Sequence, residues 1–225
     1  MGVAGARYPS HMSRLVVIRQ LDARTPYLEG WEQQRTIHAA VVDGSAPGTL
    51  LLVEHDPVYT AGKRTRPEDR PFDGSPVIDV DRGGRITWHG PGQLTGYPIV
   101  TLPSPVDVLV YVHHLEAAIM QVCADLGIVT ERQDERTGVW VPADDRGPAR
   151  KIAAIGVRVA RGVTMHGFAL NCDNALDAYH RIVPCGIRDA GVTTISEELG
   201  RRVGIADVVD AVEAALRTEL EDWIA

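Results

Sequence analysis

The sequence predicts a single domain of the α/β (α+β) class, with a central mixed, largely antiparallel sheet flanked by helices. Three observations support this fold class. Short runs rich in β-branched residues alternate with amphipathic helical patterns, two of the runs are separated by a tight-turn signal, and no internal repeat or linker divides the chain. With 225 residues, 44% of them hydrophobic, the chain is long enough to bury one sizeable core.

The first third of the chain is predicted to contain two strands and one helix. Residues 14–21 form the first strand, and residues 26–42 form a helix with Thr25 as its cap and Pro26 at its first position. Residues 49–55, TLLLVEH, are nearly all apolar, which is typical of a central strand covered on both faces.

A glycine-rich stretch, RGGRITWHGPGQLTGYP from Arg82 to Pro98, is the most distinctive segment. Its glycines allow backbone torsions and close approaches that a Cβ would prevent, and ITWH within it is predicted to be a strand. Residues 77–80 and 99–102 are predicted to be strands before and after it. The stretch fits backbone held against a ligand, or equally a glycine-rich hairpin between two strands of one sheet. The polar side chains available to a ligand would be those of Arg82, Thr87, His89 and Gln93.

Three further helices are predicted in the rest of the chain. Apolar residues at intervals of three and four predict a helix over 105–126, ended by Gly127, and another over 206–223. A shorter helix is predicted over 175–183.

The strands of this region surround one strong turn signal. Residues 151–160 and 163–171 are predicted to form a hairpin joined at Arg161-Gly162, and residues 139–141 form a brief strand before it. The polar segment ADDRGPAR, residues 143–150, is interpreted as a turn that has no bearing on the chemistry.

Composition and charge exclude several classes of function. The net charge of −7, from 30 acidic and 23 basic side chains, argues against a general nucleic-acid binder. No apolar run approaches the roughly 20 residues that a membrane-spanning helix needs, and no signal peptide is recognisable. The three cysteines form no CxxC pair and fit a reducing, cytoplasmic location. Residues 1–12, MGVAGARYPSHM, are interpreted as an expression-tag remnant, which leaves 13–225 as the domain.

Each cysteine has a structural and a chemical interpretation. Cys123 lies in a strong helical pattern, where a buried, inert thiol is expected, and Cys172 ends a strand. Cys185 differs because it lies between Pro184 and Gly186, on a tight turn that would present its thiol. A nucleophilic thiol needs a cation nearby, because the thiolate is the reactive form and the ordinary thiol pKa is about 8.5.

Lys151 is the candidate cation, because it begins the otherwise apolar strand KIAAIGV. The alternative is a lysine that extends its ammonium to solvent at the sheet edge. His89 and His166 are rival activators, since both lie inside strand-like runs. The histidines and cysteines show no tight metal-ligand spacing, so no metal site is expected.

Small residues in the predicted strands and turns could leave an apolar slot for a ligand. The alternative is close packing of neighbouring strands, and the sequence does not separate the two. The residues concerned are Gly83, Gly84, Ala153, Ala154, Gly156 and Gly167.

Four segments in this order, RGGRITWHGPGQLTGYP, KIAAIGV, HGFALN and IVPCGI, resemble the lipoyl(octanoyl) transferases of the LipB family. The resemblance extends from Arg14 through Trp223. It implies the fold of the catalytic domain of biotin and lipoate-protein ligases. It also implies a reaction, the first step of endogenous protein lipoylation in lipoate biosynthesis, in which an octanoyl group passes from acyl carrier protein to a lysine of a lipoyl domain.

The resemblance also implies a role for individual residues. Cys185 would carry the acyl group as a thioester, and Lys151 would lower the pKa of that thiol, so that the two form a Cys/Lys dyad. The acyl-binding segments would be Arg82, Gly83, Gly84, Arg85, Ile86, Thr87, Trp88 and His89, then Ala154, Ile155 and Gly156, and finally Gly167, Phe168 and Ala169.

The implied partners are octanoyl-acyl carrier protein as donor and lipoyl domains as acceptors. These domains belong to 2-oxoacid dehydrogenase complexes and to the glycine cleavage H protein. No cofactor is implied, because the acyl group arrives on the phosphopantetheine arm of the carrier, and the enzyme is expected to be a monomer. Two alternatives stay open: an ATP-dependent lipoate or biotin ligase, which needs no nucleophilic cysteine, and a non-catalytic relative that binds an acylated carrier.

Overall fold

One large sheet forms the centre of the molecule. The structure, a computed structural model, describes residues 15–134, 136–182 and 191–224, so the interpreted tag remnant and Cys185 lie outside the described residues. The strand order is β1-β2-β6-β10-β9-β8-β7, and β11 pairs with β9. The strands are β1 (Leu15–Thr25), β2 (Gly48–His55), β6 (Gln93–Ile99), β7 (Glu131–Gln133), β8 (Arg136–Val141), β9 (Arg150–Ala160), β10 (Val163–Asn171) and β11 (Gly191–Val192).

The sheet is mixed and largely antiparallel, as the sequence predicts. The pairs β1–β2 and β9–β11 are parallel, whereas the pairs along the path from β2 to β7 are antiparallel. The predicted hairpin is confirmed: Arg161 and Gly162 both have left-handed φ values, 53° and 76°, between β9 and β10. Such a two-residue turn matches the twist of the strands it joins.

A smaller sheet holds part of the glycine-rich stretch. Its order is β4-β3-β5, with β3 (Val58–Ala61), β4 (Val77–Asp79) and β5 (Ile86–His89). The predicted ITWH strand is therefore β5. The hairpin interpretation is wrong, because β5 and β6 belong to different sheets. The strand predicted over 99–102 is also misplaced, since β6 begins at Gln93, within the glycine-rich stretch, and ends at Ile99.

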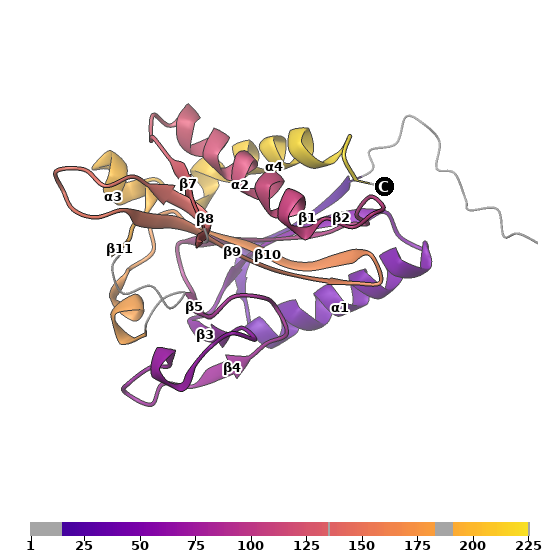
Figure 1. Ribbon diagram of the computed structural model, residues 1–225, viewed down its shortest axis with the longest axis horizontal. Helices are drawn as coiled ribbons and strands as arrows, with labels where there is room; N and C mark the ends of the chain where they lie inside the picture. Colours follow the sequence, from indigo (N-terminus) through magenta and orange to yellow (C-terminus); the bar gives the residue numbers. More distant parts are fainter. Residues whose placement is uncertain (1–14, 135, 183–190, 225) are drawn as a thin grey trace, which may run out of the picture.

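Helices cover both faces of the large sheet (Figure 1). Helices α2 (Val108–Asp125) and α4 (Ile205–Leu220) pack together on one face, and α1 (Tyr27–Asp43) lies on the other, on the side of the small sheet. The main core fills the space between the sheet and the α2–α4 pair, with Leu115, Ile119 and Val212 fully buried. A short helix, α3 (Ile195–Leu199), follows β11.

Several predicted helix starts are corrected by local contacts. Helix α1 begins at Tyr27. Thr25, predicted as its cap, still belongs to β1, and Pro26, predicted at the first helical position, precedes the helix with an extended ψ of 134°. Helix α2 begins at Val108. The preceding residue, Asp107, caps it, because its carboxylate accepts hydrogen bonds from the backbone N–H groups of Leu109 and Val110.

The helix predicted over 175–183 is a single 3₁₀ turn, η2 (Asp177–Arg181). Leu176 and Ile182, at the two ends of this turn, both pack against the small sheet. The backbone therefore turns tightly between two anchored apolar side chains instead of continuing as a helix.

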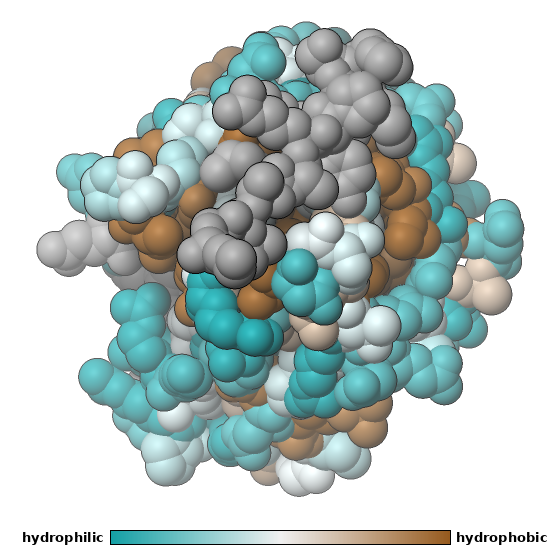
Figure 2. All heavy atoms as spheres, turned by 90° about the vertical axis from the view of Figure 1, so that its right-hand side faces the viewer, coloured by the Kyte–Doolittle hydropathy of each residue, from teal (hydrophilic) through white to brown (hydrophobic). Residues whose placement is uncertain are grey.

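Hydrophilic and hydrophobic residues share the face that lies to the right in Figure 1. Figure 2 shows hydrophilic residues along most of its margins, and hydrophobic residues in its upper half and again near its lower edge. Over the described ranges, the helices are too short or too polar to cross a bilayer.

Candidate active site

The candidate site is a pocket of about 680 Å³ beside β9. Strand β8 pairs with β9 at Arg150, Lys151 and Ala153. Further along β9, residues 82–85 at the start of the glycine-rich stretch, which we call the glycine-rich loop, lie against the strand instead. The Gly83 N–H donates to the Val157 carbonyl oxygen at 2.9 Å. The pocket is lined by residues of β8, β9, β10 and this loop, so it lies where the neighbour of β9 changes from a strand to a loop.

A bulge in β9 brings Lys151 to the pocket. Val139 pairs with Ala153 and the next residue, Trp140, pairs with Lys151, so β9 has one extra residue, Ile152. Ile152 and Ala153 both belong to the core between sheet and helices. Lys151 and Ala154, on either side of them, line the pocket. Without the bulge, strict alternation would place Lys151 and Ala154 on opposite faces.

The Lys151 ammonium is buried and has few partners. The residue is 7% exposed, so it does not extend its side chain to solvent at the sheet edge. Its Nζ donates to the Thr137 carbonyl oxygen at 2.9 Å and lies 4.6 Å from the centre of the Trp140 ring. A Cβ on Gly138, whose φ is 125°, would lie 2.6 Å from the Ala153 carbonyl oxygen and 3.3 Å from Lys151 Cε, so this glycine lets β8 approach both the β9 backbone and the lysine side chain.

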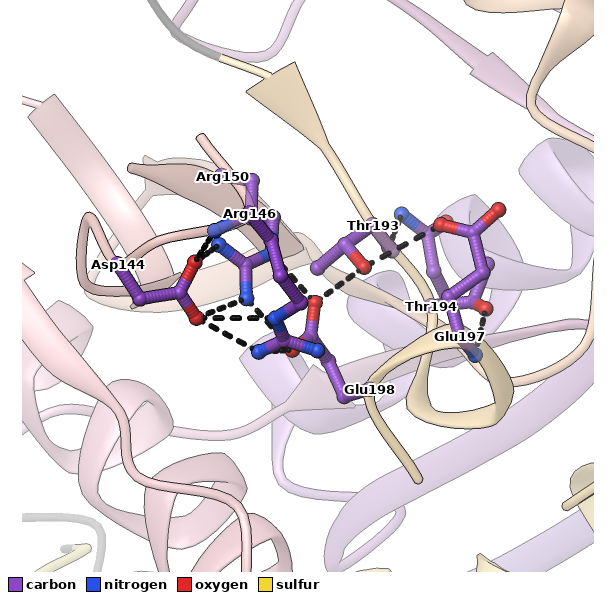
Figure 3. Close-up of polar contacts among 8 residues, drawn as sticks. Asp144, Arg146, Arg150, Thr193, Thr194, Glu197 and Glu198 are labelled. Atoms are coloured by element: carbon purple, nitrogen blue, oxygen red, sulfur yellow. Dashed lines mark hydrogen bonds and ion pairs between the residues drawn. The ribbon is translucent and has the colours of Figure 1, made fainter. Parts of the chain in front are cut away.

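The strand that follows residues 183–190 is attached directly to Lys151. Strand β11 pairs with Arg150 and Lys151, and the Thr193 N–H donates to the Lys151 carbonyl oxygen at 3.0 Å. The Thr193 hydroxyl donates to Glu198 Oε1 at 2.6 Å (Figure 3). These bonds hold the start of α3 against the strand that carries the lysine.

Figure 3 shows that the segment 143–150 completes this anchor. Arg150 donates to both Glu198 oxygens at 2.6 and 2.8 Å and to both Asp144 oxygens at 3.0 and 2.9 Å. Arg146 also forms ion pairs with the carboxylates of Asp144 and Glu198. The Glu198 side chain is only 4% exposed. Burial raises the pKa of Glu198, but hydrogen bonds from Arg150 and Thr193 outweigh it, and the pKa lies below its usual value. The segment 143–150, expected to have no bearing on the chemistry, therefore ties the residue before Lys151 to α3.

Arg82 lies at the pocket as a structural cation. It is 7% exposed, and its guanidinium donates to the carbonyl oxygens of Gly83, Arg85 and Thr60 at 2.8–3.0 Å. It also donates to Thr60 Oγ1 at 2.9 Å. One side chain thus holds both the glycine-rich loop and β3 in place.

The rival activators are neutral histidines. Burial, with the charges of His55 and Arg82, lowers the pKa of His89 to about 3. Its Nδ1 contacts Gln93 Oε1 at 2.8 Å and its Nε2 contacts Thr60 Oγ1 at 3.3 Å. Burial likewise lowers the pKa of His166, whose Nε2 lies 2.7 Å from Asp81 Oδ1. A neutral imidazole provides no cation for a thiolate.

The structure brings most of the predicted acyl-site residues together. Along β5, side chains alternate: Thr87 and His89 line the pocket, whereas Ile86 and Trp88 pack into a separate apolar cluster with Tyr59. The other predicted residues that line the pocket are Arg82, Gly83, Gly84, Arg85, Lys151, Ala154, Ile155, Gly156, Gly167, Phe168 and Ala169.

Two of the predicted slot glycines have different roles. A Cβ on Gly167 would lie 2.2 Å from the Gly96 carbonyl oxygen, so this glycine allows β10 and β6 to approach closely. A Cβ on Gly156 would lie 3.1 Å from Arg82 Cδ, a tight contact with a side chain. Ala153, also a slot candidate, lies in the core instead.

Other lining residues were not predicted. Tyr27, Thr95 and Tyr97 contribute from α1 and β6, Val108 and Val112 from α2, and Arg64, Arg66 and Arg136 supply cations. The alternation of Thr95 and Tyr97 along a strand was a usable signal, because residues two apart share a face. The contribution of α1 and α2 depends on tertiary packing.

The two described cysteines are poor nucleophiles. Cys123 and Cys172 are fully buried, and burial raises the pKa of each thiol to about 12. Cys185 lies outside the described residues, between Ile182 on the small sheet and Gly191 beside Arg150. Within the described ranges, no group of three or more His, Cys, Asp or Glu side chains could hold a metal ion.

Comparison with known proteins places this site in a family context. Residues 26–217 match the model of the lipoyl protein ligase A/B catalytic domain. An octanoyltransferase of Salinispora arenicola is 64% identical over 85% of this chain and 90% of its own length. An octanoyltransferase of Thermobifida fusca is 60% identical over 88% of this chain and 86% of its own length.

Solved structures share the fold at low sequence identity. A bipartite lipoate protein ligase from Thermoplasma acidophilum superposes with a TM-score of 0.68 at 15% identity, over 92% of this chain and 83% of that one. Biotin protein ligase from Aquifex aeolicus gives 0.54 at 15% identity, over 92% and 70%. The predicted fold, that of the biotin and lipoate-protein ligase catalytic domain, is confirmed.

Proposed function

Because the chain belongs to the lipoyl protein ligase A/B catalytic-domain family, and within it to the octanoyltransferases, we propose the following specific reaction. The enzyme takes an octanoyl group from octanoyl-acyl carrier protein, holds it as a thioester on Cys185, and passes it to a lysine of a lipoyl domain. The acceptors would be the lipoyl domains of 2-oxoacid dehydrogenase complexes and the glycine cleavage H protein.

The observation that carries this proposal is the placement of Lys151. Its ammonium lies at a pocket, is 7% exposed, and has one hydrogen-bond acceptor and one aromatic ring as partners in the described part of the chain. A buried cation that retains spare N–H donors is suited to stabilise an anion such as a thiolate. Its strand also pairs with β11, which follows the segment containing Cys185.

The first half-reaction exchanges one thioester for another. The Cys185 thiolate attacks the donor carbonyl carbon, a new C–S bond forms, and the C–S bond to the phosphopantetheine sulfur breaks. The released thiolate takes a proton from the Lys151 ammonium and leaves as a thiol, so that Lys151 is neutral when the acceptor arrives. Since both thioesters have similar energies, this step needs no ATP, and no cofactor takes part.

The second half-reaction forms an amide. The neutral amine of the acceptor lysine attacks the acyl-enzyme carbonyl, a C–N bond forms, and the bond to Cys185 Sγ breaks. The amine proton passes to Lys151 in its neutral form, which restores the ammonium beside the thiolate. Aminolysis of a thioester is downhill, so this step makes the transfer effectively one-way, with ping-pong kinetics.

The acyl chain would lie along β9 and β10. Ala154, Gly156 and Ala169 provide short side chains there, with Ile155 and Phe168 nearby. Burying about seven methylene and methyl groups at roughly 0.8 kcal/mol each contributes about 5–6 kcal/mol to binding. This contribution favours a medium-length saturated chain over a short one.

An ATP-dependent ligase is the competing reaction, and the relatives decide against it. The relatives from Salinispora arenicola and Thermobifida fusca, at 64% and 60% identity, are octanoyltransferases, which favours acyl transfer for this chain. The lipoate and biotin ligases share the fold at 15% identity, which carries no information about the reaction.

Intact-mass analysis after mixing with octanoyl-acyl carrier protein tests the proposal. The mass is expected to rise by one octanoyl group that hydroxylamine removes. Cys185→Ala should abolish this adduct, whereas Cys172→Ala and Cys123→Ala, which alter the two buried thiols, serve as matched controls and should retain it. An adduct that persists in Cys185→Ala would overturn the assignment of the nucleophile.

A further inference from the structure

The loop of residues 62–76, which we call the cationic loop, is braced from several sides. The backbone N–H groups of Lys63 and Arg64 donate to the carbonyl oxygens of Arg82 and Gly84 at 3.1 and 3.0 Å. Further along, the Phe72 N–H donates to the Arg181 carbonyl oxygen at 3.3 Å. These bonds fix the loop between the glycine-rich stretch and the residues just before the segment 183–190.

Two cations of this loop have no carboxylate partner. Three nearby carboxylates already have partners: Asp69 is buried against Arg85, Asp73 pairs with Arg181, and Asp79 pairs with Arg70 of the loop itself. Glu68 makes only a 3.8 Å contact, with Arg66. Among the described residues, Lys63 and Arg64 form no ion pair, and both are exposed.

This uncompensated charge lies at the entrance to the pocket. Arg64 and Arg66 line the pocket although both are exposed, so they form part of its rim. The same loop carries Phe72, which is 81% exposed. A protein of net charge −7 therefore presents local positive charge at the pocket rim, on a loop that also carries an exposed aromatic ring. Such a surface steers an acidic partner to its site.

We propose that the cationic loop is the docking surface for the acidic acyl carrier that delivers the octanoyl group. This inference rests on the proposed function. Lys63 and Arg64 meet the acidic surface of the carrier and the phosphodiester at the base of its arm, while Phe72 contacts an apolar part of the same surface. Arginine is suited to the second contact, because its planar guanidinium matches phosphate oxygens.

The chemistry of the two substrates favours the donor over the acceptor at this surface. The donor enters with an arm that carries a phosphate anion, which a cationic rim attracts. The acceptor enters with a lysine that is an ammonium in water, and the same rim repels it. The loop therefore accelerates the first half-reaction and not the second.

The test uses two variants with the same change in net charge. Lys63→Glu/Arg64→Glu reverses the loop, and the control Arg161→Glu/Arg201→Glu reverses two exposed arginines, at the β9–β10 turn and after α3, that form no ion pair among the described residues. A second loop variant, Phe72→Ser, changes no charge and removes no packed side chain. Circular dichroism confirms that each variant is folded.

Steady-state kinetics with both substrates varied separates the two partners, because ping-pong kinetics give an independent kcat/KM for each. We expect the loop reversal to lower kcat/KM for octanoyl-acyl carrier protein by at least tenfold relative to kcat/KM for octanoyl-pantetheine, and to weaken its dependence on salt. The control Arg161→Glu/Arg201→Glu should change neither this ratio of kcat/KM values nor the salt dependence. Phe72→Ser should lower the carrier value several-fold without altering the salt dependence.

Two outcomes of the kinetic test would overturn the proposal. Equal losses with carrier and octanoyl-pantetheine would mean that the loop only supports the pocket, and a selective loss in kcat/KM for the lipoyl domain would assign the surface to the acceptor. Calorimetric titration with the carrier alone distinguishes this failure from failure of the proposed function. If the wild-type chain binds the carrier but transfers no octanoyl group, and Lys63→Glu/Arg64→Glu abolishes that binding, the docking surface is supported and the proposed reaction is overturned.

Discussion

Arg82 and Lys151 are two buried cations at one pocket, and they differ in how many partners they have. Each is 7% exposed. Arg82 donates to three carbonyl oxygens and one hydroxyl, whereas the Lys151 ammonium has, among the described residues, one carbonyl acceptor and one aromatic ring. Equal burial therefore does not imply equal roles.

The difference follows from what each cation must do. A guanidinium with many fixed acceptors ties loop to strand and would lose much by releasing any of them. An ammonium with unused donors can bind a further group and can give up its proton, which a guanidinium cannot do at physiological pH. Arg82 is thus expected to determine stability and Lys151 to determine rate.

The largest expected effect is on catalysis, from Lys151→Met. Transfer activity, as kcat/KM with octanoyl-acyl carrier protein, should fall by roughly 10²–10⁴-fold, the usual contribution of a positioned proton-transfer group. The melting temperature should not fall, because a near-isosteric apolar side chain replaces a buried charge beside Trp140. Coupled transfer assays and thermal denaturation measure the two quantities.

Lys151→Arg is the matched control that separates the positive charge of Lys151 from its ability to accept a proton. It keeps a cation at the pocket but cannot serve as a base. If it forms the acyl-enzyme and fails to pass the octanoyl group on, the lysine is needed as a proton acceptor in the second step. Full activity in Lys151→Met would reduce Lys151 to a structural residue.

The next largest effect is on stability, from Arg82→Met. The change leaves the carbonyl oxygens of Thr60, Gly83 and Arg85 without this donor, which should destabilise the fold by about 2–4 kcal/mol. For a chain of this size that lowers the melting temperature by roughly 5–15 °C. Arg24→Met is the control, because Arg24 forms only an exposed ion pair with Asp56 and should cost less than about 1 kcal/mol. Equal shifts in both variants would contradict the comparison.

Features encoded in short segments could be predicted from the sequence. The β9–β10 hairpin follows from the turn residues Arg161 and Gly162, and α2 and α4 follow from their apolar periodicity. Alternation along β5 also contained information that was not used: residues two apart share a face, so Thr87 and His89 could have been separated from Ile86 and Trp88.

Features that depend on distant partners could not be predicted. The bulge at Ile152 exists only relative to β8, and it decides which face Lys151 occupies. The anchor of Arg150 on Glu198 joins residues 48 positions apart, so the segment 143–150 shows only a polar turn in the sequence. Whether a glycine packs strands or opens a pocket likewise depends on which atoms lie opposite, as Gly156 and Gly167 show.

The smallest expected effect comes from Gly156→Ala, which presses on Arg82 from the pocket side. The added methyl would lie 3.1 Å from Arg82 Cδ and 3.2 Å from the Gly83 carbonyl oxygen, so these neighbours must shift by a few tenths of an ångström. Narrowing the pocket by one methyl should lower kcat/KM for octanoyl relative to hexanoyl donors by a few-fold, since one buried methylene contributes about 0.8 kcal/mol. Competition between the two acyl-pantetheines, read by mass spectrometry, measures this ratio.

Gly167→Ala is the paired variant: its methyl would lie 2.2 Å from the Gly96 carbonyl oxygen, so it should lower the melting temperature without a selective effect on chain length. A change in chain-length preference in Gly167→Ala alone would mean that the pocket is shaped at β10 and not against Arg82.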